Sequence, residues 1–133
     1  MHDLVMQPDE PWPSEWLRGV MDVCVLSVLA DGPTYGYAIA ARLADSGLGV
    51  VKGGTLYPLL KRLESAGHLT VEWRAGDGGP GRKYYELTAV GRSQLDAWAE
   101  QWSAFVGLTS AIITPTTTPR TGALAPADPE ETP

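Results

Sequence analysis

The hydrophobic pattern of the chain changes its period after residue 67, and this change limits the folds available to it. Residues 69–73 alternate apolar and polar side chains, as a β-strand does, and Trp73 is predicted to face the core. A glycine-rich segment, 76–81, follows, and residues 83–87 predict a returning strand. Before the change, four leucines have the spacing of one helix face: Leu56, Leu59, Leu60 and Leu63. The sequence therefore predicts a helix that leads directly into a two-stranded hairpin.

Two further helices are predicted before this unit. The first runs from an N-cap at Ser14 to Ala30, and the second runs from an N-cap at Thr34 to about Ala44. One apolar stripe of the first helix comprises Leu17, Val20, Met21, Cys24 and Val28, with Cys24 predicted as a buried structural residue. A second stripe comprises Trp16, Val23 and Leu26. A small domain normally needs only one apolar helix face, so the second stripe predicts contact with a partner chain.

A final helix is predicted from a cap at Thr88 to about residue 113. Its apolar residues are spaced 3, 4, 3 and 7 apart, which is the seam of a coiled coil: Leu95, Trp98, Trp102, Phe105 and Ile112. We expect Leu95, Trp98, Trp102 and Phe105 to form a dimer interface.

The net charge of -6 hides an uneven distribution of charged residues. Residues 42–92 hold eight Lys or Arg against five acids, a net of +3, whereas residues 1–41 carry -5 and residues 93–133 carry -4. A basic middle segment can bind phosphates while acidic ends keep the protein soluble. The chain lacks an apolar run of ~20 residues, which a membrane span requires, and its single cysteine fits a reducing compartment. We therefore expect a cytoplasmic protein without a membrane partner.

The predicted order of a helix, a helix-turn-helix and a basic hairpin is that of a winged helix, a mainly α fold of the α+β type. In such folds the second helix of the helix-turn-helix lies in the DNA major groove. The expected organisation is a flexible arm (1–13), a winged-helix DNA-binding domain (14–88), a dimerisation helix (89–113) and a disordered tail (114–133). Taken separately, an exposed helix face and a glycine-rich loop remain ordinary surface features, and their combination favours DNA binding. The predicted DNA contacts are Thr34, Tyr35, Tyr37, Lys52, Thr55, Tyr57, Lys61, Arg62, Arg74, Arg82 and Lys83.

Three separated motifs then point to a family. They are Tyr35-Gly36-Tyr37 with Ile39, the segment 54–64 (GTLYPLLKRLE) with Gly67, and the segment 81–88 (GRKYYELT) with Gly91. Over roughly residues 16–107 the chain resembles the PadR family of transcriptional regulators, although Lys52-Gly53 stands where that family often has Ser-Pro. The resemblance implies a homodimer, usually a repressor, that binds a palindromic double-stranded operator.

The single helix after the hairpin resembles the short PadR subfamily, in which the last helix packs against the first helix of the partner. Some members of that subfamily hold flat aromatic ligands between tryptophans at the dimer centre. The resemblance therefore implies a planar aromatic or cationic effector, with Asp22 attracting a cation. The alternative, in which the tryptophans only fill the dimer interface, stays open. The residues implied for such a site are Trp16, Asp22, Val23, Leu26, Trp98 and Trp102.

Two other functional classes are alternatives to DNA binding. The first alternative is a winged-helix adaptor that uses its acidic ends to bind other proteins and does not bind DNA. An enzyme is not expected, because the sequence offers no nucleophile-base pair and its two histidines provide no zinc set. No cofactor or metal is predicted.

Overall fold

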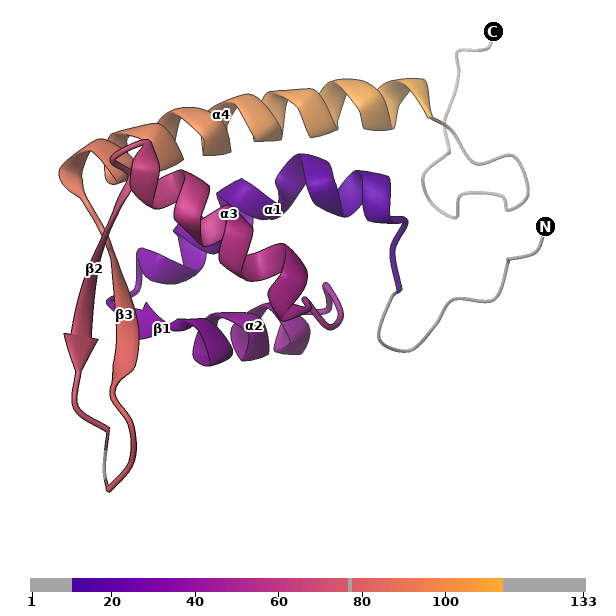
Figure 1. Cartoon of the computed structure of the whole chain (residues 1–133). Coiled ribbons are helices and arrows are strands. Elements are labelled where there is room, and N and C mark those ends of the chain that lie inside the picture. The colour runs from indigo at the N-terminus through magenta and orange to yellow at the C-terminus, as the bar shows by residue number, and fades with distance from the viewer. Residues whose placement is uncertain (1–10, 77, 114–133) are drawn as a thin grey trace, which may run out of the picture. The chain divides into compact units, whose positions relative to one another are not determined.

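The computed structural model describes residues 11–76 and 78–113. Most of the predicted arm and all of the predicted tail lie outside the described residues. The chain consists of two compact units, and the boundary between them lies between Glu100 and Gln101. The elements in chain order are α1 (Ser14–Leu29), β1 (Thr34–Tyr35), α2 (Gly36–Asp45), α3 (Gly53–Ser65), β2 (Leu69–Arg74), β3 (Arg82–Leu87) and α4 (Ala89–Ile112) (Figure 1). This is the expected mainly helical winged-helix fold. No helix in the described part of the chain could cross a membrane.

The three strands form one antiparallel sheet in the order β1-β3-β2. The short strand β1 corrects the prediction that Thr34 caps the second helix. Thr34 pairs with Tyr85 and Tyr35 pairs with Tyr84, so α2 begins only at Gly36, with Tyr35 as its N-cap. A two-residue strand is too short to produce a recognisable alternation, and Thr and Tyr favour extended backbone because their side chains pack well on a sheet.

The core of the first unit lies between the three helices and the inner face of the sheet. In α1 the buried residues are Met21, Val25, Leu26, Val28 and Leu29, whereas Cys24 is only half-buried. The prediction that Leu26 belongs to a second, outward stripe was therefore wrong. The reason is that α1 packs against both α2 and β3, so it buries a wider face than one stripe. Of the predicted second stripe, Trp16 is exposed and Val23 is half-buried.

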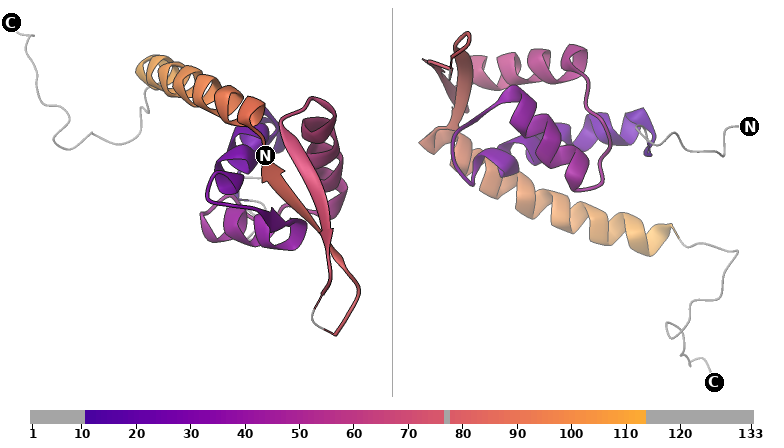
Figure 2. Two further views of the ribbon diagram at one scale, coloured as in Figure 1. Left: turned by 90° about the vertical axis from the view of Figure 1, so that its left-hand side faces the viewer. Right: turned by 90° about the horizontal axis from the view of Figure 1, so that it is seen from below.

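The hairpin of β2 and β3, residues 69–87, projects beyond the helices, and we call it the wing (Figures 1 and 2). Its inner face buries Leu69 and Tyr85 at the end nearest the core. Trp73 shares this face but is 68% exposed, so the prediction that it is a core residue was wrong. The alternation correctly assigns Trp73 to the inner face, but this part of the hairpin extends past the helices that would cover it.

The start of α4 is held against the turn between α3 and β2 by the predicted cap residue. The Thr88 hydroxyl accepts a hydrogen bond from the Gly91 N–H (2.9 Å) and donates one to the Gly67 carbonyl (2.7 Å). The Thr88 N–H donates to the His68 carbonyl (3.0 Å). The ring of His68 meets the edge of Trp98, with 5.7 Å between centroids. The first turns of α4 are therefore fixed to the winged-helix core.

Candidate nucleic-acid interface

Helix α3 presents a polar outer face because its four leucines are all buried on the opposite side. Thr55, Tyr57 and Lys61 are exposed on the outer face. At the N-terminus of α3, no side chain forms a capping hydrogen bond, and the exposed Gly53 and Gly54 occupy the first two helical positions. Unpaired N–H groups in the first turn, together with the helix dipole, favour an anion such as a phosphate.

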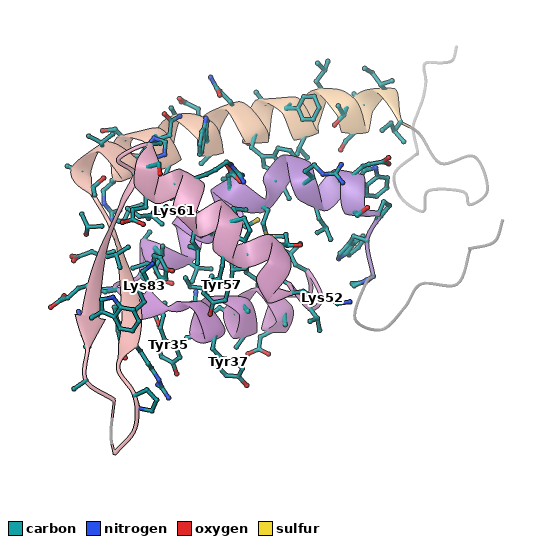
Figure 3. The ribbon with its side chains drawn as sticks, in the orientation of Figure 1. Tyr35, Tyr37, Lys52, Tyr57, Lys61 and Lys83 are labelled. Atoms are coloured by element: carbon teal, nitrogen blue, oxygen red, sulfur yellow. The ribbon has the colours of Figure 1, made fainter. Side chains whose placement is uncertain are left out.

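Tyr57 is set in place by close contact between α3 and α2. Its ring lies over Gly36, where a Cβ atom would collide with the ring, so a larger residue would separate the two helices. Tyr57 remains 49% exposed and Tyr37 is 75% exposed. Figure 3 shows Tyr57 between α3 and α2, with Tyr37 directed away from α2 on the side toward which the wing projects. Two tyrosines predicted to contact DNA are therefore exposed on the helix-turn-helix.

On the outer face of the sheet, two arginines and two tyrosines form a continuous series of contacts that we call the wing stack. The Arg74 guanidinium lies over the Tyr84 ring at 4.3 Å, and the Arg82 guanidinium lies over the Tyr35 ring at 4.4 Å. The two rings are 5.4 Å apart, tilted by 56°. Arg74 and Arg82 are also cross-strand partners at the outer end of the paired strands. The wing stack thus links all three strands at the base of the wing tip.

The inner face of the wing carries a different pair of side chains. Lys83 is opposite Trp73 in the strand register, and its Nζ lies 6.0 Å from the ring centroid of Tyr85. The basic residues of the wing are therefore divided between its two faces. Burial raises the pKa of Tyr85 above its ordinary value, and Tyr57 and Glu64 raise it further by charge repulsion.

Arg62 and Asp22 were predicted to serve different sites, but they form an ion pair with each other. The Arg62 Nη2 atom donates to the Asp22 Oδ1 atom at 3.2 Å, which joins α3 to α1. The Asp22 side chain is 33% exposed and that of Arg62 is 63% exposed. Arg62 is thereby directed toward α1, whereas its neighbour Lys61 has no ion-pair partner among the described residues. In this structure the Asp22 carboxylate already has a cationic partner.

The residues predicted for the dimer and ligand site have different environments. Leu95 and Leu26 are buried in the core of their own chain, which corrects their assignment to an intermolecular surface, since α4 and α1 both pack there. Trp98 is half-buried against His68. In the second unit, Trp102 is 38% exposed and Phe105 is 54% exposed, with 5.8 Å between their ring centroids.

Sequence reasoning missed two notable residues of this surface. Tyr84 was not selected, although its spacing of two from Arg82 places both on one sheet face. Trp73 was assigned to the core and is exposed on the wing. No group of His, Cys, Asp and Glu within the described residues could hold a metal ion.

Comparison with known proteins identifies the family of the chain. The profile of the transcriptional regulator PadR-like family matches residues 25–97, more than half of the chain. A transcriptional regulator of Mycobacterium tuberculosis is 37% identical over 81 residues, 61% of this chain and 74% of that protein. The crystal structure of a PadR family regulator from Eggerthella lenta is 40% identical with a TM-score of 0.67, covering 77% of this chain and 89% of that one. A PadR-like regulator from Bacillus cereus is 28% identical with a TM-score of 0.68, covering 77% and 99%. The chain therefore belongs to the PadR-like family, and it is a transcriptional regulator rather than an enzyme.

Proposed function

We propose that the protein is a homodimeric repressor that binds double-stranded operator DNA through α3 and the wing. The observation that carries this proposal is the outer face of α3, which exposes Thr55, Tyr57 and Lys61 beside a wing that carries stacked arginines. Because the leucine face of α3 is fully occupied by the core, the polar face is the one available for the major groove. The family consists of transcriptional regulators, which supports DNA as the partner.

The proposed contacts are divided between base edges and phosphates. Thr55 and Tyr57 lie in the first turns of α3, the part of a recognition helix that reaches base edges. The open N-terminus of α3, Lys61 and the wing arginines bind phosphates, and an arginine near the tip also suits the negative potential of the minor groove. A dimer that places two such helices in successive major grooves requires half-sites ~34–36 Å apart.

The proposed dimer forms through the C-terminal part of α4. Large apolar side chains in residues 102–113 are exposed in the single chain: Trp102, Phe105, Val106, Leu108, Ile112 and Ile113. A cluster of this kind on one short helical segment is unusual for a monomer, and a second copy of the helix supplies a cover of the same chemistry. We further propose that a planar aromatic effector stacks on Trp102 and favours a dimer whose helix spacing no longer fits the operator.

DNA binding is tested by fluorescence anisotropy with labelled duplexes from the region upstream of the protein's own gene, together with a random duplex. Lys61→Gln and Arg82→Gln should weaken binding, and each should reduce the slope of log Kd against log salt by about 0.9. Arg42→Gln is the matched control, because Arg42 is equally basic but already pairs with Asp31 at 2.8 Å. Unchanged affinity in both test variants would exclude the proposed contact surface. Failure of the wild type to bind any duplex would favour the protein-binding adaptor.

Dimerisation and effector binding need a second pair of measurements. Light scattering after gel filtration should give twice the 14.2 kDa chain mass for the wild type. Phe105→Glu should give a monomer, and Ser110→Glu on the same helix should remain dimeric. Trp102→Ala should abolish the quenching of tryptophan emission by ethidium, and retained quenching with equal affinity would argue against Trp102 as the stacking surface.

A further inference from the structure

We infer that Tyr35 and Tyr84 are positioning residues that hold Arg82 and Arg74 ready for phosphate binding. The inference rests on the proposed DNA-binding function and deepens it. It gives Tyr35 a different role from the direct DNA contact that the sequence predicts, and it adds Tyr84, which the sequence reasoning passed over. The four residues concerned are those of the wing stack.

The geometry of the wing stack matches this role. Each arginine has a ring of its own, at 4.3 Å for Arg74 on Tyr84 and 4.4 Å for Arg82 on Tyr35. The two rings are adjacent and join β1 to β3, so the platform is part of the sheet. Tyr35 and Tyr84 are both only half-buried, which leaves the stacked arginines at the surface.

The chemistry of the guanidinium group explains why stacking prepares it for binding. Cation–π contact uses the flat face of the group, whereas its five N–H donors point outward in the plane. A stacked arginine therefore keeps its donors for a phosphate, whereas an arginine held by a bidentate salt bridge does not. Among the described residues, Arg82 has no carboxylate within salt-bridge distance, and Arg74 has only a 3.6 Å contact with Glu72.

The pairing of β2 with β3 indicates a second role for the wing stack. Arg74 and Arg82 are direct cross-strand partners, and like charges in that position repel each other. Stacking on two separate rings offsets this repulsion and restricts side chains that otherwise lose considerable rotamer freedom when they bind. The rings therefore hold two positive charges close together at the base of the wing tip, where one DNA backbone can meet both.

The test compares phenylalanine and leucine at each tyrosine. Tyr35→Phe and Tyr84→Phe keep the π face and should bind a random duplex at low salt with nearly wild-type affinity. Tyr35→Leu and Tyr84→Leu keep apolar bulk without the π face and should weaken binding by roughly three- to tenfold. The loss from Tyr35→Leu should disappear when Arg82→Gln is already present, because the ring acts only through that arginine. The loss from Tyr84→Leu should likewise disappear in the Arg74→Gln background.

A measurement on the free protein separates positioning from a general loss of stability. NMR should show the δ protons of Arg82 shifted upfield by the Tyr35 ring, with the shift kept in Tyr35→Phe and lost in Tyr35→Leu. Loss of affinity in Tyr35→Phe would show that the hydroxyl contacts DNA directly and would overturn the inference. An equal loss from Tyr35→Leu with and without Arg82→Gln would also overturn it. If the wild type binds no duplex, the proposed function fails and the positioning role fails with it. If the wild type binds and the leucine variants bind equally well, only the positioning role fails.

Discussion

Gly91→Ala should destabilise the protein, although alanine normally strengthens a helix. Gly91 is buried in the first turn of α4. A Cβ atom there would collide with the His68 carbonyl oxygen and approach the Leu87 Cδ1 atom to 2.9 Å. The obstructing carbonyl belongs to the backbone of the turn between α3 and β2, so it cannot rotate away as a flexible side chain does. The first turn of α4 would have to move outward.

The size of the effect follows from three contributions. Overpacking of a close contact costs about 1–3 kcal/mol. Movement of α4 also weakens the Thr88 hydrogen bonds to His68 and Gly67, at about 1 kcal/mol for each bond lost. Replacing glycine by alanine inside a helix returns about 0.5–1 kcal/mol. If one of these two bonds is lost, the net expectation is a loss of about 1–3 kcal/mol in the free energy of unfolding, or a fall in Tm of about 5–20 °C for a domain of this size.

Thermal unfolding followed by circular dichroism measures this directly, at one protein concentration because the proposed dimer makes Tm concentration-dependent. Gly107→Ala is the matched control in the same helix, since a Cβ at Gly107 meets nothing within 4 Å. The control should be unchanged or up to about 1 kcal/mol more stable. A Gly91→Ala protein with a Tm at or above that of the wild type would refute the close approach of α4 to His68.

Three further predictions concern the wing, the ion pair and the cysteine. Trp73→Ala should change the free energy of unfolding by no more than about 0.5 kcal/mol in urea titrations, because Trp73 is 68% exposed, whereas a loss of about 3 kcal/mol or more would mean that it is a core residue after all. Asp22→Asn should release Arg62 and tighten binding to a random duplex at low salt. The control Asp31→Asn, which frees Arg42 in the same way, should have a smaller effect. Equal effects of the two substitutions would show that only the net charge matters. Burial raises the pKa of the Cys24 thiol above the ordinary 9.0, so the unfolded chain releases this proton first and the free energy of unfolding should fall as pH rises past 9.0. Urea titrations of Cys24→Ala should show a smaller fall than those of the wild type. An identical fall in the two proteins would contradict the burial of the thiol.

Much of the fold follows from local pattern. The leucine spacing of α3, the alternation of β2 and the cap at Thr88 depend on neighbouring residues, and the structure has all three. The motifs around Tyr35, Tyr57 and Arg82 are also local, which is why they identified the family. The strand β1 escaped prediction because two residues form its entire length and its partner lies about 50 positions along the chain.

The sequence by itself therefore determined the helices and the hairpin of β2 and β3, the polar face of α3 and the basic character of the wing. The tertiary structure alone decided that Arg62 pairs with Asp22, that Leu26 and Leu95 belong to the core, and that Trp73 is exposed. The physical reason is that periodicity indicates which face of a helix or strand a residue occupies. It does not indicate which other helix or strand packs against that face, or how far along the face that packing extends. Partners 40 positions apart, such as Arg62 and Asp22, meet only once the helices have packed.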